Sequence, residues 1–197
     1  MFWNTVSGLY DLFEAFNSKA NNRTAELIAS YVTSSDTVLE CACGTGIMTR
    51  VFAPKAGRVI ATDVAPKMLK RAAKKLKGMD HVLFEEADIT DLRFGDNSFD
   101  ITIAANVIHL VDDPQKAASE LMRVTKPGGL VIVPTYITQE KKTAKLAVRL
   151  LELIGADFKK EFTAESYKEY WKSLGYDPEF RIEDGNVPCM VAIIRKP

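Results

Sequence analysis

The sequence predicts an α/β protein with a doubly wound, mainly parallel sheet and helices on both of its faces. From residue 37 onward, short apolar runs alternate with charged segments whose apolar residues recur at helical spacing. This alternation is typical of a parallel sheet, because each crossover between parallel strands needs a connection that is usually a helix. A glycine-rich loop follows the first apolar run, and acidic residues follow the next two. Ligands of such sheets bind outside the carboxyl ends of the strands, so these residues predict a binding site there.

The apolar runs have the length and composition of strands, and they span residues 37–42, 58–63, 82–87, 99–104 and 130–136. The segments between them predict helices over residues 45–52, 66–76 and 114–124. The third helix is well delimited, because Asp113 is a good N-cap and Pro114 suits the first helical position. Residues 126–129, with the sequence KPGG, are expected to end it.

Two segments depart from this alternation. Residues 1–33 predict an N-terminal helical cap that either packs on the core or closes over the site as a lid. Its apolar side chains recur at spacings of four and three, namely Phe2, Val6, Leu9, Phe13 and Phe16. Residues 137–176 predict a helical insert after the fifth strand, with one helix in 140–155 and another that starts at Thr163 and ends at Gly175. Residues 179–183 and 189–195 then resemble an antiparallel pair at the edge of the sheet.

The composition is that of a globular protein with a single domain, residues 1–197. The 26 Lys and Arg residues balance the 26 Asp and Glu residues, so no nucleic acid partner is expected. The longest uncharged runs, residues 127–139 and 101–111, are shorter than the roughly 18 apolar residues of a membrane span. The first basic residue, Lys19, follows two acidic residues, so we expect no secretory signal and a cytoplasmic location. The three cysteines predict no disulfide scaffold.

The first strand runs directly into the sequence Glu40-Cys-Ala-Cys-Gly-Thr-Gly46. Glycines let this loop approach a ligand closely, and the helix after it presents free N–H groups. Asp63 ends the second strand, where its carboxylate can bind both hydroxyls of a ribose. Asp88 ends the third strand, where the edge of an adenine would lie. Acidic residues at three successive strand exits are a more specific signal than the glycine loop alone.

This arrangement resembles the class I S-adenosylmethionine-dependent methyltransferases. The resemblance extends from about residue 36 to the C-terminus through the motifs VLECACGTG, VIATDVAPKML, FEEADITDL, FDITIAANVIHLVDD and RVTKPGGLVIVPTY. It implies a Rossmann-like sheet of seven strands in the order 3-2-1-4-5-7-6 with strand 7 antiparallel, and S-adenosyl-L-methionine as cofactor. One departure is Ala42, where the strict family pattern has its first glycine and where alanine is a frequent variant.

The resemblance also implies a set of cofactor-binding positions. Those for the methionine portion and the ribose are Glu40, Cys41, Ala42, Cys43, Gly44 and Gly46, of which Glu40 would hold the amino group. Those for the ribose hydroxyls and the adenine are Asp63, Val64, Met68, Asp88 and Ile89. Asn106 and Val107 would face the transferring methyl group. No metal site is expected, because Cys41 and Cys43 have no second ligand pair at suitable spacing.

Methyl transfer from a sulfonium mainly requires alignment of donor and acceptor, so a catalytic base is optional. His109 is the candidate base, although a histidine at this place more often packs the loop and bonds to the backbone. Tyr10 and Tyr136 are candidates to bind the acceptor or to shield the sulfonium, and the alternative for each is a half-buried core aromatic. The N-terminal sequence FWNTVSGLYDLFEAF resembles that of the ubiquinone/menaquinone-biosynthesis methyltransferases. A small, apolar or aromatic acceptor is therefore expected, and the methylated atom stays open. The protein is expected to be a monomer or a homodimer.

Two alternatives remain. An NAD(P)-dependent oxidoreductase also uses a glycine loop and an acid after the second strand. However, Ile47, Met48 and Thr49 follow the loop where that fingerprint has its third glycine, and Glu40 would lie close to a pyrophosphate. The other alternative is a non-catalytic S-adenosylmethionine-binding protein that regulates a partner. It would bind the cofactor without turnover.

Overall fold

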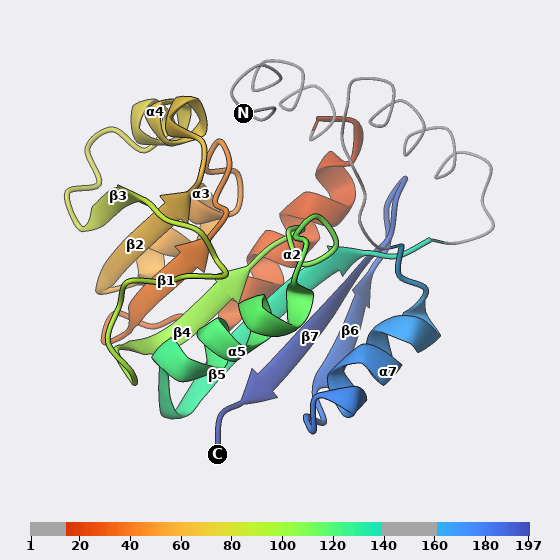
Figure 1. Ribbon diagram of the computed structural model, residues 1–197. Helices are drawn as coiled ribbons and strands as arrows, with labels where there is room; N and C mark the ends of the chain where they lie inside the picture. Colours follow the sequence, from red (N-terminus) through yellow and green to blue (C-terminus); the bar gives the residue numbers. More distant parts are fainter. Residues whose placement is uncertain (1–14, 139–160) are drawn as a thin grey trace.

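A computed structural model describes residues 15–138 and 161–197 and shows one twisted sheet between two layers of helices (Figure 1). The sheet has seven strands in the order β3-β2-β1-β4-β5-β7-β6. Their bounds are Thr37–Cys41 (β1), Arg58–Asp63 (β2), Val82–Glu86 (β3), Phe99–Ala104 (β4), Thr125–Tyr136 (β5), Glu179–Glu183 (β6) and Cys189–Arg195 (β7). β7 runs antiparallel to both β5 and β6, whereas the other neighbours are parallel. The predicted fold class and strand order are confirmed.

Each face of the sheet has its own apolar core, because successive residues of a strand point to opposite faces. In β1, Val38 packs in the cluster that contains residues of α2 and α4, and Leu39 packs in the cluster of α5 and α7. Figure 1 shows α5 and α7 in front of the sheet and α2 behind it. The helices are Ser18–Tyr31 (α2), Thr49–Phe52 (α3), Pro66–Lys75 (α4), Pro114–Val124 (α5) and Ala164–Ser173 (α7), with a 3-10 turn at Ala53–Lys55.

The predicted capping residues are found where the sequence indicates. The side chain of Asp113 accepts a hydrogen bond from the backbone N–H of Lys116 at 2.9 Å, with Pro114 in the first turn of α5. Thr163 caps α7 by accepting from the N–H of Ser166, and Gly175 follows that helix with a φ of 83°. Two predicted features, the helix within residues 140–155 and the apolar positions before residue 15, lie outside the described residues.

Two boundaries differ from the sequence prediction. The helix expected over residues 45–52 begins only at Thr49, because the preceding residues form the turns of the glycine loop. β5 begins at Thr125 and not at residue 130, so the KPGG segment belongs to the strand. Its backbone pairs with the C-terminal end of the chain, since the N–H of Gly128 donates to the carbonyl of Lys196 at 2.8 Å. A φ of 77° at Gly128 allows the bend that this pairing requires.

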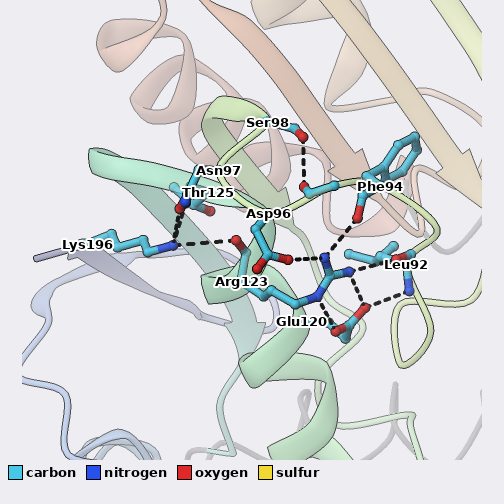
Figure 2. Close-up of polar contacts among 10 residues, drawn as sticks. Leu92, Phe94, Asp96, Asn97, Ser98, Glu120, Arg123, Thr125 and Lys196 are labelled. Carbon is cyan, nitrogen blue, oxygen red and sulfur yellow. Dashed lines mark hydrogen bonds and ion pairs between the residues drawn. The ribbon is translucent and has the colours of Figure 1, made fainter.

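Arg123 ties the loop between β3 and β4 to α5, at the end of the sheet away from the carboxyl ends of the parallel strands (Figure 2). Its Nε donates to Glu120 Oε1 at 2.7 Å, and Glu120 Oε2 in turn accepts from the N–H of Leu92 at 2.8 Å. The other guanidinium nitrogens bind the carbonyls of Leu92 and Phe94 and the carboxylate of Asp96 at 2.7–2.8 Å. One planar cation thus holds a loop that has no regular structure of its own.

Within residues 15–138 and 161–197, no helix combines the length and the apolar character that crossing a bilayer would require.

We expect the Arg123→Ala variant to lower the free energy of unfolding by about 2 kcal/mol, because two loop carbonyls lose their side-chain donor and two carboxylates lose the cation that binds them. Arg123→Lys should restore part of that loss, since an ammonium group keeps the charge but not the fork. Urea denaturation measures both. Arg93→Ala is the matched control, because Arg93 lies in the same loop and is exposed. Equal effects at Arg93 and Arg123 would contradict the bracing role.

Candidate functional site

A cavity of about 550 Å³ opens at the carboxyl ends of the parallel strands. Many of the positions that the sequence predicts as site residues lie on its wall, namely Ala42, Gly44, Asp63, Val64, Met68, Asp88, Ile89, Asn106, Val107, His109 and Tyr136. The other predicted positions in the described part of the chain, Glu40, Cys41, Cys43 and Gly46, do not line it. Tyr10 lies outside the described residues. The parallel sheet therefore brings residues from four strand exits and the end of β5 into one cavity.

The glycine loop folds back through left-handed backbone conformations. The φ angles of Ala42, Gly44 and Gly46 are 54°, 55° and 78°. Glycine adopts these angles freely, whereas an alanine there carries a strain of about 1 kcal/mol. A Cβ atom on Gly46 would lie 2.8 Å from the side chain of Leu76 and 3.1 Å from that of Ala72, so this glycine lets the loop pack against α4. The loop is thereby held close to the cavity.

Asp63 fastens this loop to the end of β2. Its Oδ2 accepts the N–H of Gly44 and its Oδ1 accepts the N–H of Ala65, both at 2.9 Å. Burial raises the pKa of Asp63, and these two hydrogen bonds oppose the rise. Each carboxylate oxygen can accept a further hydrogen bond. Because the side chain also lines the cavity, it can receive two adjacent hydroxyl groups of a ligand.

An apolar slot lies beside Asp63. Val64 lies between β2 and α4, Met68 lies in the first turn of α4, and Ile89 follows β3. Asp88, at one end of this slot, is exposed and oriented by its neighbour, because its Oδ1 accepts both the N–H and the hydroxyl of Thr90 at 2.8 Å. Its other oxygen takes no part in those bonds, so it can accept hydrogen from a ligand. An apolar surface that shares one cavity with the carboxylates of Asp63 and Asp88 fits a nucleoside.

Glu40 lies beneath the glycine loop. Residues of β1 alternate between the two faces of the sheet, and Glu40 lies toward α3, where Thr49 Oγ1 donates to its Oε2 at 2.5 Å. The side chain is 1% exposed. Burial raises the pKa of Glu40 to about 8. Cys41 and Cys43 are buried free thiols in the two cores, on opposite faces of the sheet.

The other end of the cavity is built from uncharged polar groups. His109 is 4% exposed, and its Nδ1 lies 2.9 Å from the hydroxyl oxygen of Thr135. Burial lowers the pKa of His109 to about 4, so the ring is neutral at physiological pH. The hydroxyl of Tyr136 donates to Oδ1 of Asn21 in α2 at 3.1 Å, and the rings of His109 and Tyr136 are 6.1 Å apart. The cavity wall at His109 and Tyr136 is therefore uncharged and partly aromatic.

Several wall residues were not predicted from the sequence: Ala87, Thr90, Ala105, Leu110, Val111, Asp112, Asp113 and Lys116. Most of them belong to the segment between β4 and α5, where the sequence predicts Asn106, Val107 and His109 as site residues and Asp113 only as an N-cap. The apolar stretch VIHLV before that cap was the available signal. Asn21 and Thr135 were missed as well. The signal that could have found them is a polar residue at a position of a helix or strand that is expected to be buried.

The buried carboxyl of Glu40 should make stability depend on pH. Its pKa is about 8 in the folded chain and has its ordinary value of 4.5 when exposed. Between these values the folded chain holds a proton that the unfolded chain has lost, so the free energy of unfolding falls as the pH rises. Urea denaturation at several pH values should show that Glu40→Gln removes this part of the slope, because glutamine does not titrate.

Glu120→Gln is the control for that experiment. Hydrogen bonds from Arg123 lower the pKa of Glu120, so well above its ordinary value of 4.5 this carboxyl is ionised in both states. In the upper part of the window, its replacement should therefore change the free energy of unfolding by an amount that does not vary with pH. A wild-type slope in Glu40→Gln would show that Glu40 does not titrate there.

Comparisons with known proteins point to a methyltransferase. Residues 39–133 match a family described as a methyltransferase domain. The chain is similar to a demethylmenaquinone methyltransferase of Clavibacter sepedonicus, with 35% identity over 136 residues that cover 68% of this chain and 56% of that protein. It is also similar to the ubiquinone/menaquinone biosynthesis C-methyltransferase UbiE of Pseudomonas paraeruginosa, with 33% identity over 193 residues, 90% of this chain and 74% of that protein.

Among solved structures, a SAM-dependent methyltransferase from Thermotoga maritima has the same fold, with a TM-score of 0.76, 19% identity and coverage of 100% of this chain and 99% of that one. The chain spans about half the length of the first curated relatives that it matches, 56% and 44%. The match to the Pseudomonas protein nevertheless extends over most of both chains. The chain belongs to the class I S-adenosylmethionine-dependent methyltransferases.

Proposed function

We propose that the protein transfers a methyl group from S-adenosyl-L-methionine to a small, apolar or aromatic acceptor. The observation that carries this proposal is the division of one cavity into two halves. Asp63 and Asp88 flank an apolar slot in one half, and His109 and Tyr136 form an uncharged wall in the other. A nucleoside cofactor fits the first half, and an acceptor without charge fits the second.

The described residues suit this cofactor. Its sulfonium and ammonium groups are cationic, and the carboxyls of Asp63 and Asp88, which line the cavity, favour a cation there. Asp63 would bind the ribose hydroxyls, Val64, Met68 and Ile89 would enclose the adenine, and Asp88 would accept its amino hydrogen. The backbone at Ala42 and Gly44 would follow the methionine portion. Glu40, beneath the loop, would hold the amino group of the methionine portion.

The bound cofactor supplies a methyl group that its positive charge has already activated. The chain then has to align the acceptor with that methyl and to exclude water. Asn106 and Val107 follow β4 and line the cavity. The N–H of Asn106 donates to the carbonyl of Pro134 at 2.8 Å, which fixes its backbone. We assign Tyr136 and His109, and Tyr10 of the N-terminal cap, to the acceptor.

For the acceptor we propose a reduced quinone or a related hydroxylated aromatic ring. The support is the similarity to proteins named demethylmenaquinone methyltransferase and ubiquinone/menaquinone biosynthesis C-methyltransferase. The neutral wall of His109 and Tyr136 suits such a ring better than it suits a charged acceptor. Neither the domain match nor these relatives point to an oxidoreductase.

Calorimetric titration with S-adenosylmethionine and S-adenosylhomocysteine tests the cofactor half. We expect Asp63→Ala and Asp88→Ala each to weaken binding by at least about tenfold, because each removes hydrogen bonds between a carboxylate and the ligand. Asp91→Ala is the matched control, since Asp91 is exposed and does not line the cavity. Unchanged affinity in Asp63→Ala would refute its ribose role, and no binding of either ligand by the wild type would refute the proposal.

A methyl-transfer assay tests the acceptor half. With labelled S-adenosylmethionine, we expect a short-chain demethylmenaquinol, kept reduced, to gain label. A malonyl thioester serves as the comparison acceptor, because a malonyl-acyl-carrier-protein O-methyltransferase of Serratia marcescens is 31% identical over 130 residues. Label in the thioester and not in the demethylmenaquinol would refute the aromatic acceptor in favour of a malonyl thioester. Cofactor binding without transfer to any acceptor would favour the regulatory alternative.

A further inference from the structure

We propose that Thr135 fixes the tautomer of His109, so that His109 offers an N–H donor to an oxygen atom of the acceptor and does not take a proton from it. The inference rests on the proposed function, because it assigns His109 to the acceptor half of the cavity. It also narrows the substrate class to molecules that carry an oxygen able to accept this hydrogen bond. Thr135 is thereby a positioning residue that acts through His109.

The contact itself is buried and simple. Thr135 lies in β5, is 0% exposed and does not line the cavity. Its hydroxyl oxygen is 2.9 Å from His109 Nδ1, and within residues 15–138 and 161–197 this is its one hydrogen-bond partner. His109 lines the cavity and Thr135 does not, so with Nδ1 against Thr135 we assign Nε2 to the cavity side.

Two proton arrangements are compatible with that distance. If Nδ1 carried the proton and donated it, the hydroxyl proton of Thr135 would be buried with no acceptor in the described part of the chain. A buried donor without an acceptor is costly, whereas an unused lone pair on an oxygen that already has a partner costs less. The hydroxyl therefore donates to Nδ1. Nδ1 then carries no proton, and the proton of the neutral ring resides on Nε2.

The charge state of the ring agrees with this arrangement. Burial holds the pKa of His109 at about 4, so the doubly protonated ring is rare at neutral pH. A neutral ring whose proton is on Nε2 has no free lone pair on the cavity side, so it cannot serve there as a base. It can donate to a carbonyl, hydroxyl or phenolate oxygen. The ring of Tyr136, 6.1 Å away, provides an adjacent aromatic surface.

Nitrogen-15 NMR of the free protein at neutral pH reads the tautomer directly, without any ligand. The chain has only two histidines, so His81→Gln assigns both sets of ring signals. His81 is an internal reference, because its Nε2 lies 2.9 Å from the carbonyl oxygen of Ala53, which can only accept. We expect His109 to show the same Nε2–H form. An Nδ1–H form in the wild type would overturn the proposal.

Three variants then separate positioning from mere packing. Thr135→Val keeps the shape and removes the hydroxyl, so we expect His109 to lose its single tautomer and transfer to the demethylmenaquinol to fall about tenfold. Thr135→Ser keeps the hydroxyl and should retain both. Thr102→Val is the matched control, because Thr102 is a buried strand residue whose hydroxyl pairs with Thr125, and it does not line the cavity.

An unchanged tautomer and rate in Thr135→Val would overturn the proposal, as would equal losses in Thr135→Val and Thr102→Val. Failure of the proposed function gives a different result. If the wild type methylates neither the demethylmenaquinol nor the thioester, the acceptor assignment is refuted, while the tautomer in the wild type and in Thr135→Val still decides what Thr135 does to His109.

Discussion

The carboxylate of Asp63 is the contact on which the site depends. It receives one N–H from the glycine loop after β1 and another from the start of α4, and so joins two neighbouring strand exits. A buried carboxylate must be compensated by hydrogen bonds, and the loop supplies them. The loop in turn adopts left-handed φ angles at Ala42, Gly44 and Gly46 that have no support from regular structure. Loop and carboxylate therefore stabilise each other, and the lone pairs left on Asp63 are those available to a ligand.

Much of this half of the site follows from the sequence. Parallel strands end at one edge of the sheet, so residues directly after them must meet, and Asp63 and Asp88 do line one cavity. The same reasoning does not resolve which side chains of the loop face the cavity. β1 alternates, so Glu40 lies toward α3 and Cys41 toward the opposite core, and only Ala42 and Gly44 of the loop reach the wall.

The other half could not be predicted in the same way. Asn21 meets Tyr136 across 115 positions of the chain, and a sequence pattern says nothing of such a pairing. Thr135 lies in a strand that is buried on both faces, where apolar periodicity vanishes and a single hydroxyl has no visible orientation. The start of β5 was predicted at residue 130 and not at Thr125, because its pairing too involves residues far apart in the chain. Glycines after a helix usually end it, but here Gly128 continues into a strand because the C-terminal segment pairs with it.

The cofactor half and the acceptor half of the cavity differ in how they can select a ligand. Carboxylates at the strand exits attract a cation over a distance, whereas His109, Tyr136, Asn21 and Thr135 hold each other through bonds between uncharged groups. A cationic acceptor would lose its hydration without gaining a charged partner among them, since the other charged residues on the described part of the wall, Asp112, Asp113 and Lys116, lie at the start of α5. A neutral acceptor loses less, and one oxygen suffices to orient it against a single N–H donor. In the acceptor half, selection therefore depends on which ring nitrogen of His109 carries the proton.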